Sequence, residues 1–376
     1  SILGIDGWRW VFLVNVPIGI AALAVVTKTL HLRHTRLDHR IDWAGAALLS
    51  LSLVPLLLVA EQGREWGWGS TNAIICYVIG VVAAIGFFWQ EHRMGEEAIL
   101  PLAMFRNKTV GVSSIASVLI GVAMFGGLAA LPLYLQIVKG ASPTEAGLLL
   151  LPMTLGIMIG SILSGQIISR TGRYRVFPIV GSALLTISLF IFHYVAYDTP
   201  LWQTMIVMTM FGVGLGFNFQ PLTLAVQNAV PPQQIGVATS TATFTRQIGG
   251  TLGTAVFLSI LFSTASEKIT TALAAAVPTQ EFQAALADPA NAAVAEQFAA
   301  AQSGGGAATS VLSDSSFLTG LDERLAKPFL IGFSEAMDLV FLTGSAIMVL
   351  GFLVMLMLPS VELRKSSGYS ERALAE

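Results

Sequence analysis

Nine long apolar stretches constrain the fold of this 376-residue chain more than any other feature. A helix needs about 20 mostly apolar residues to cross the hydrocarbon core of a bilayer, which is about 30 Å thick. Only 11% of the residues are charged, against about 25% in soluble domains. We therefore predict an all-α polytopic membrane protein with nine spans, at Trp10 to Val26, Trp43 to Ala60, Asn72 to Gln90, Thr109 to Leu135, Glu145 to Ser169, Val176 to Ala196, Leu201 to Asn228, Gly236 to Phe262 and Met337 to Leu358.

The basic residues of the connecting segments predict the orientation of these spans. The segments on one side hold 13 Lys and Arg, and the short segments on the other side hold 3. Short loops rich in Lys and Arg stay in the cytoplasm, whereas loops longer than about 60 residues are discounted. We therefore expect a multi-pass protein of the cell (inner or cytoplasmic) membrane, with residue 1 outside and the C-terminus in the cytoplasm. The chain starts at Ser1 without a signal peptide pattern, so we expect the native N-terminus to be absent.

Small residues and one long connection organise the second part of the chain. Glycines recur four residues apart, a spacing that lets helix backbones approach closely in lipid. These pairs are Gly156 and Gly160, Gly212 and Gly216, and Gly249 and Gly253. The long segment 263–335 is expected outside the membrane. Its last part, Phe317 to Phe333, has apolar residues at helical spacing, which predicts an interfacial helix; a flexible linker is the alternative.

Arg246 is the clear case of an ionisable residue inside a predicted span. Such residues are costly in lipid and are functional candidates by default. It lies 16 residues before Phe262, about 24 Å at about 1.5 Å per residue, within reach of the cytoplasmic surface by snorkelling. A gate or ion-pair role, packing with snorkelling, and direct substrate contact are its three interpretations. The residues predicted to share its helical face are Thr239, Thr243, Gly250 and Gly253.

The seventh predicted span carries a second polar face. This stripe consists of Gly212, Gly216, Gln220, Thr223 and Gln227, with Asn218 nearby. Polar residues on one face in lipid either bond to another helix or line a cavity, and a run of five favours a cavity wall. Tyr134 and Gln136, near the outer end of the fourth span, are weaker candidates. The candidate substrate or gating residues are therefore Arg246, Gln220, Asn218, Thr223, Thr243 and Tyr134.

The sequence contains no pattern typical of an enzyme. It has no pair of histidines four apart with a Glu, no Gly-rich phosphate loop and no acidic cluster for Mg²⁺. We expect no cofactor, no metal and no nucleic acid partner, although His31, His34 and His39 leave a weak metal site as an alternative to a solvated cationic loop. Acidic residues fall at span ends, so a proton-carrying carboxylate is expected only upstream of this chain. These are Asp42, Glu61, Glu145, Glu335 and Asp338.

Four segments resemble the major facilitator superfamily, and within it the drug:proton antiporters with fourteen spans. The start of the chain resembles the start of that family's sixth span through Trp8, Arg9, Asn15, Pro17 and Gly19. Asp42, Trp43 and Gly45 are similar to the start of its seventh span. Gly165, Arg170, Gly172 and Arg173 resemble the basic loop motif of the superfamily, in which Gly165 would permit close helix contact. Arg246, Gln247, Gly249 and Gly250 are similar to the pattern of the thirteenth span.

The resemblance implies that the nine spans are spans six to fourteen of a transporter. Residues 1–30 would be the last span of the N-terminal half, 31–108 a cytoplasmic loop with two linker spans, and 109–376 a six-span bundle with outer loop 263–335 and cytoplasmic tail 359–376. It implies a secondary active transporter that exports amphipathic or cationic drugs in exchange for protons, as in multidrug efflux and antibiotic resistance. It also implies that this chain is a fragment that is inactive alone.

Two other functions stay open at this point. One is a dedicated exporter of a lipid, siderophore or secondary metabolite, and the other is a non-transporting membrane sensor or scaffold that uses the outer loop. The expected partners are membrane lipids, small amphipathic substrates and protons, with an extracytoplasmic adaptor protein as a further candidate.

Overall fold

The computed structural model describes residues 7–29, 42–291 and 321–360, and every regular element in these ranges is a helix. The predicted all-α class is therefore confirmed for this part of the chain. Two shorter apolar helices, Asn15–Thr29 and Val176–Phe192, overlap the predicted spans Trp10 to Val26 and Val176 to Ala196. Seven helices among the described residues are long and apolar enough to cross a membrane: Trp43–Gly63, Thr71–Met94, Lys108–Val138, Pro143–Thr171, Leu201–Asn228, Pro232–Ala276 and Glu323–Leu356.

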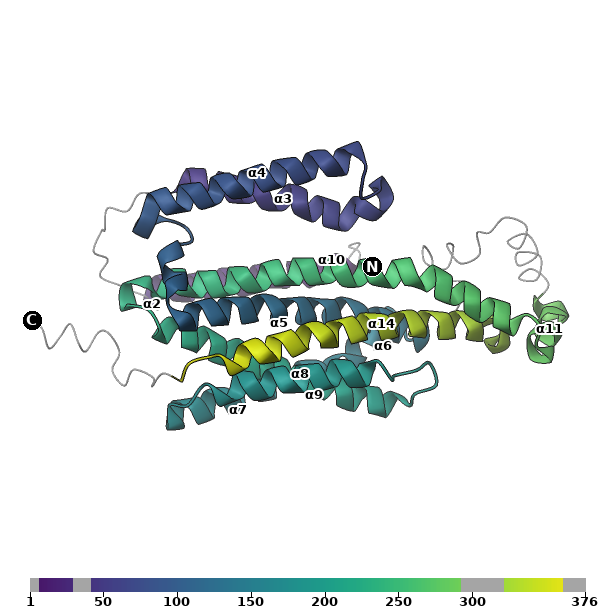
Figure 1. Cartoon of the computed structure of the whole chain (residues 1–376). Helices are drawn as coiled ribbons and strands as arrows, with labels where there is room; N and C mark the ends of the chain where they lie inside the picture. The colour runs from purple at the N-terminus through teal and green to yellow at the C-terminus, as the bar shows by residue number, and fades with distance from the viewer. Residues whose placement is uncertain (1–6, 30–41, 292–320, 361–376) are drawn as a thin grey trace, which may run out of the picture. The chain divides into compact units, whose positions relative to one another are not determined.

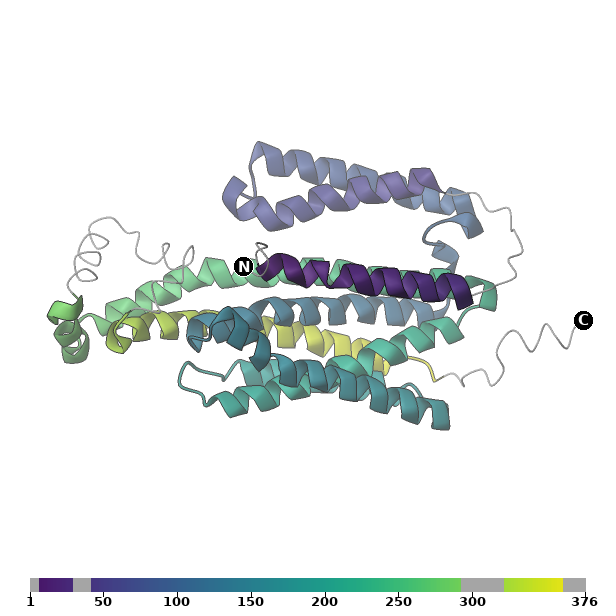
Figure 2. The same cartoon turned by 180° about the vertical axis from the view of Figure 1, so that it is seen from behind.

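The described residues 7–29 belong to a unit separate from the rest of the chain. In it, α1 (Gly7–Leu13) and α2 (Asn15–Thr29) run end to end, as Figure 2 shows. Proline and glycine disfavour a regular helix, so the sequence predicts a break of this span at Pro17 and Gly19, but the structure has the break at Val14. Pro17 is the third residue of α2, in the first turn, where proline disturbs a helix least.

The second unit, residues 42–376, begins with a hairpin of α3 (Trp43–Trp66) and α4 (Thr71–Met94). Asp42 caps α3, because its Oδ1 accepts a hydrogen bond from the Gly45 backbone N–H at 2.8 Å. The same oxygen accepts from Gln90 Nε2 at 3.0 Å, which ties the start of α3 to the end of α4. Asp42 thus has a structural role at the base of the hairpin.

The remaining long helices pack into one bundle. They are α5 (Lys108–Leu133) with the π-helix η3 (Tyr134–Val138), α6 (Pro143–Leu149), α7 (Leu151–Thr171), α8 (Val176–Phe192), α9 (Leu201–Asn228), α10 (Ile235–Ala276) and α14 (Glu323–Leu356). Figure 1 shows α5, α10 and α14 side by side, and α7 pairs with α9. The outward faces expose large apolar side chains such as Leu155, Ile187 and Leu350, as expected where lipid is the solvent.

Glycines make the contact between α7 and α9 a contact of backbones. A Cβ atom added to Gly160 would lie 2.7 Å from the Val213 carbonyl oxygen, and one added to Gly216 would lie 2.5 Å from the Ile157 carbonyl oxygen. The other glycine of each pair meets the partner backbone as closely. The close approach predicted from the four-residue spacing is confirmed for these two helices.

The segment predicted as an outer loop is helical at both of its described ends. Helix α10 continues 14 residues past Phe262 to Ala276, and α14 begins 14 residues before Met337. Gly332 lets the two backbones meet, since a Cβ there would lie 2.5 Å from Ile269 Cα. Leu325, Phe329 and Phe333, which the sequence predicts to face a membrane surface, are instead buried in one cluster with Ile269 and Leu273 of α10. The start of that predicted interfacial helix, residues 317–320, lies outside the described residues. We call residues 263–291 and 321–337 the outer helical extension.

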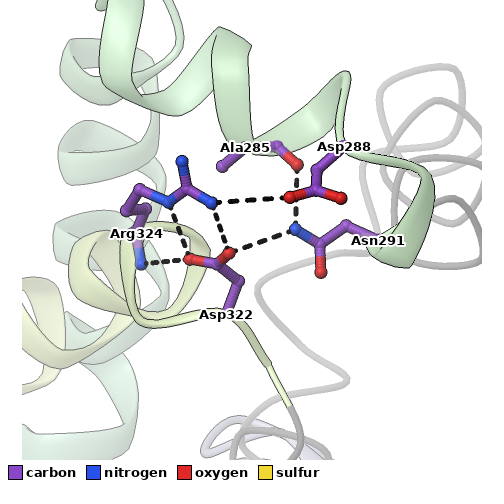
Figure 3. Close-up of polar contacts among 5 residues, drawn as sticks. All are labelled: Ala285, Asp288, Asn291, Asp322 and Arg324. Atoms are coloured by element: carbon purple, nitrogen blue, oxygen red, sulfur yellow. Dashed lines mark hydrogen bonds and ion pairs between the residues drawn. The ribbon is translucent and has the colours of Figure 1, made fainter.

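A cluster of polar contacts closes the tip of this extension (Figure 3). Asp322 Oδ1 accepts from the Arg324 backbone N–H at 2.9 Å, and Oδ2 accepts from Arg324 Nη2 at 2.6 Å. These bonds hold the pKa of the Asp322 carboxyl well below its ordinary range. Asn291 Nδ2 donates both to Asp322 Oδ2 at 3.3 Å and to the Ala285 carbonyl at 2.9 Å, so residue 291 is held beside residue 322.

Candidate functional site

A pocket of about 360 Å³ lies between α5, α9 and α10. Its volume is in the range of small-molecule sites, about 300–1,000 Å³. The pocket brings together four of the six candidate residues named from the sequence, Arg246, Gln220, Thr223 and Thr243. It is completed by Met124, Phe125, Phe219 and Gln247.

The contact between α5 and α10 fixes the position of Arg246. Gly249 packs directly on the α5 backbone at Val118, and Gly253 does so one turn further along. From the other side, Gly121 of α5 faces the carbonyl oxygen of Arg246, where a Cβ atom would collide. The backbone of α10 therefore lies directly against that of α5 from Arg246 to Gly253, and the Arg246 side chain lies beside α9.

The Arg246 guanidinium lies over an aromatic ring. Its Cζ is 4.9 Å from the centroid of Phe219, a cation–π contact. Among the described residues no carboxylate lies within 4 Å of it, so the ion pair considered from the sequence is not formed in this part of the chain. Arg246 follows the start of α10 by 11 residues, about 17 Å along the helix.

The polar side chains of the pocket offer both acceptors and donors. The hydroxyls of Thr223 and Thr243 each donate to a carbonyl one turn back on their own helix at 3.0 Å, so their oxygens are left as acceptors. The amides of Gln220 and Gln247 are exposed and make no hydrogen bond to other described residues. The pocket can therefore bind the polar edge of a ligand at several points.

The apolar side chains of the pocket supply flat surfaces. Phe125 and Phe219 present aromatic rings, and Met124 presents a polarisable thioether. Gly250 leaves the space that the Phe125 ring occupies, because a Cβ there would collide with that ring. The glycines similar to the thirteenth-span pattern thus shape the pocket in addition to bringing the helices together.

Two candidate residues lie away from the pocket. Asn218 is fully buried, donates from Nδ2 to the Gly214 carbonyl at 2.7 Å and lies against Gly181 of α8. The position of Asn218 differs from the prediction because Asn218 precedes Gln220 by two residues. Two residues along a helix correspond to a rotation of about 200°, which places Asn218 on the face opposite Gln220. Tyr134 is also buried, and its hydroxyl donates to the Ala196 carbonyl at 3.2 Å, which gives it a structural contact.

The loop after α7 holds the second family-like motif. Gly172 ends α7 with a φ of 70°, a left-handed conformation that suits glycine. Arg170 and Arg173 are exposed and form no ion pair with other described residues. A Cβ on Gly165 would meet no atom within 4 Å, so the close helix contact expected there is not made in this part of the chain.

The sequence reading missed the residues that fasten this loop to the bundle. Arg175 Nη2 donates to the Leu356 carbonyl at 2.9 Å, and the buried Tyr174 hydroxyl donates to the Pro359 carbonyl at 3.0 Å. Both bonds capture carbonyls at the end of α14. No local pattern gives this contact, since its partners are more than 180 residues apart.

The other residues named from the sequence are placed only in part. Trp8 and Arg9 lie in α1, whereas Asn15, Pro17 and Gly19 lie in α2. The histidines considered as a weak metal site, His31, His34 and His39, fall outside the described residues. Within the described ranges no three His, Cys, Asp or Glu side chains gather as metal ligands would.

The sequence also did not predict a set of polar contacts at the opposite end of the bundle. His193 Nδ1 lies 3.1 Å from the Asp338 carbonyl oxygen, and the buried Asp338 Oδ1 has no hydrogen-bond partner among the described residues. Nearby, Lys139 Nζ donates to the Tyr197 and Thr199 carbonyls at 2.7 Å each. Burial lowers the pKa of Lys139, and the neighbouring Asp198 charge partly offsets this. These contacts tie α5 and α14 to the end of α8.

Comparison with known proteins gives a consistent picture. The family model for the Major Facilitator Superfamily matches residues 1–254. A tetracycline resistance determinant of Streptomyces rimosus is 37% identical over 83% of this chain and 90% of its own length. An uncharacterized MFS-type transporter of Mycobacterium tuberculosis is 32% identical over 95% of this chain, and Multidrug resistance protein 3 of Bacillus subtilis is 33% identical over 63%. The chain spans about half the length of these last two, 48% and 46%.

Proposed function

From the premise that this chain belongs to the Major Facilitator Superfamily, we propose that it forms part of a secondary active transporter that exports amphipathic drugs in exchange for protons. It is a multi-span helical membrane protein. The names of its relatives support drugs as the substrate class, since they include a tetracycline resistance determinant and a multidrug resistance protein.

The observation that carries this proposal is the pocket around Arg246. It combines donors, acceptors and aromatic surfaces in a wall formed by three membrane helices, as a site for an amphipathic molecule requires. In transporters of this architecture the substrate site lies near the midplane, and two halves rock around it. We propose that α5, α9 and α10 form the wall that the C-terminal half contributes.

The finer assignments belong to the same proposal. The nine apolar segments would correspond to spans six to fourteen of a fourteen-span antiporter, with residue 1 outside and the C-terminus in the cytoplasm. The match covers about half of the Mycobacterium tuberculosis and Bacillus subtilis relatives and 90% of the Streptomyces rimosus relative. Protons would drive export through a titratable group of the full-length protein.

Transport in inverted membrane vesicles that contain the full-length protein tests the proposal. Tetracycline and ethidium are offered outside, and a pH gradient, acidic inside, is imposed. We expect accumulation that disappears when nigericin collapses the gradient, and none in vesicles from cells lacking the protein. Accumulation that ignores the gradient would refute proton coupling, and no accumulation of any drug tested would refute export.

A further inference from the structure

The pocket around Arg246 is lined by a single charged side chain, and its charge is positive. Of its eight lining side chains, the Arg246 guanidinium is the only ionised group, and none is a carboxylate. The guanidinium carries five N–H donors. None of them bonds to a protein acceptor within the described ranges, and the ring of Phe219 lies against the group. The positive charge is therefore left for a ligand to neutralise.

The other lining groups are compatible with the same ligand. The amides of Gln220 and Gln247 add N–H donors beside the guanidinium. The rings of Phe125 and Phe219 favour a planar apolar body. A guanidinium binds a carboxylate or an enolate by two parallel hydrogen bonds, and it repels a second cation in a wall of low polarity.

We infer that this pocket selects planar aromatic amphiphiles that carry an oxyanion, such as a carboxylate, phenolate or enolate, over cationic ones of the same shape. The inference rests on the proposed function, because it names the substrate class of the same site. It narrows the substrate class expected from the sequence, which was amphipathic or cationic drugs.

The location of Arg246 makes this selectivity a fixed property of the wall. Its backbone is held by Gly121 on α5, and its side chain is held by Phe219 on α9. The charge therefore does not need to be ordered when the ligand arrives, which lowers the cost of binding. A lysine here would keep the charge but lose the planar, two-pronged geometry.

Two xanthene dyes provide a matched pair of probes. Fluorescein is anionic at pH 8 and rhodamine 6G is cationic, on the same ring system. Their binding is measured by fluorescence anisotropy with purified full-length protein in phosphatidylcholine nanodiscs, after subtraction of empty nanodiscs. We expect the wild-type protein to bind fluorescein more tightly. Arg246→Gln should weaken fluorescein binding about 10- to 100-fold, the range of a charge-assisted hydrogen bond, and leave rhodamine 6G unchanged or tighter.

Two further variants separate charge from folding. Arg106→Gln removes an exposed arginine of η2 (Leu102–Arg106), outside the pocket, and should bind both dyes as the wild type does. Arg246→Lys should bind fluorescein with intermediate affinity. If Arg246→Gln does not fold, the wild-type preference and the lysine variant still decide the matter. Tighter binding of rhodamine 6G to the wild type, or equal fluorescein binding by all variants, would overturn the inference.

Energised export of both dyes, measured in vesicles in parallel, distinguishes this inference from the proposed function. Export of rhodamine 6G together with weak fluorescein binding would overturn the inference and leave the proposed function standing. Selective, Arg246-dependent fluorescein binding without export of any compound would support the inference and contradict the proposed function.

Discussion

Replacing Gly160 by alanine tests the contact on which the packing of α7 against α9 depends. The added Cβ would lie 2.7 Å from the Val213 carbonyl oxygen, whereas ordinary contact begins at 3.4 Å. The oxygen belongs to a helix backbone, so it cannot swing aside, and the helices must separate locally by about 0.7 Å. A gap of that size forfeits about a quarter to a half of the dispersion energy of each atom pair along the contact. We expect destabilisation of about 1–3 kcal/mol, the usual cost of overpacking.

Gly165, five residues along the same helix, is the matched control. A Cβ there meets nothing within 4 Å, so Gly165→Ala should be neutral, or stabilising by about 0.5–1 kcal/mol through higher helix propensity. The assay is reversible unfolding of the purified protein in mixed micelles of increasing SDS fraction, followed by circular dichroism. Equal stability of the two variants, or a larger loss for Gly165→Ala, would show that α7 and α9 are not in contact through their glycines.

Three further perturbations test other parts of the structure. Asp322→Asn should loosen the tip of the outer helical extension at neutral pH, measured as faster amide hydrogen exchange at residues 280–291 after correction for intrinsic rates. Because the pKa of Asp322 is depressed, the wild-type protection against exchange should be full at neutral pH and should be lost as the pH falls below the ordinary Asp pKa of about 4. A variant tip as protected as the wild type would refute this. Arg175→Ala should lower stability by about 1–2 kcal/mol, because it removes the hydrogen bond to the Leu356 carbonyl, whereas Arg173→Ala should not, because Arg173 is exposed. The two variants are compared by thermal unfolding in detergent, and equal melting temperatures would contradict the contact. Replacing residues 292–320 by a short Gly-Ser linker should leave the bundle folded. Replacing residues 270–315 in the same way should not, because that deletion removes the buried Leu273, Phe282 and Ala285. Size-exclusion chromatography of the two variants shows which one is monodisperse.

The parts of the fold that follow local periodicity could be predicted from the sequence. Glycines four residues apart predicted a close approach of helix backbones, which α7 and α9 make, but the spacing did not identify which helices would meet. The helical faces of Arg246 and Gln220 brought four residues to one pocket. Asn218 was misplaced because it was named for its nearness in the chain, not for its angle around the helix.

Other features depend on contacts that leave no local pattern. The apolar stripe of residues 323–333 looks the same whether it faces a membrane surface or α10, so the sequence did not reveal the outer helical extension. The bond from Arg175 to Leu356 joins residues 181 apart, and positively charged loops have a simpler explanation in membrane topology.

The hydrogen bond between Asn291 and Asp322 makes the tip of the outer helical extension a suitable place for an insertion. Because the Asn291 and Asp322 side chains are in direct contact, the segment that joins them can change in length at low cost, about 0.6 kcal/mol for each doubling. A reporter, an affinity tag or a whole recognition domain could be grafted there. The helices of the bundle, and the pocket around Arg246, would then keep their packing.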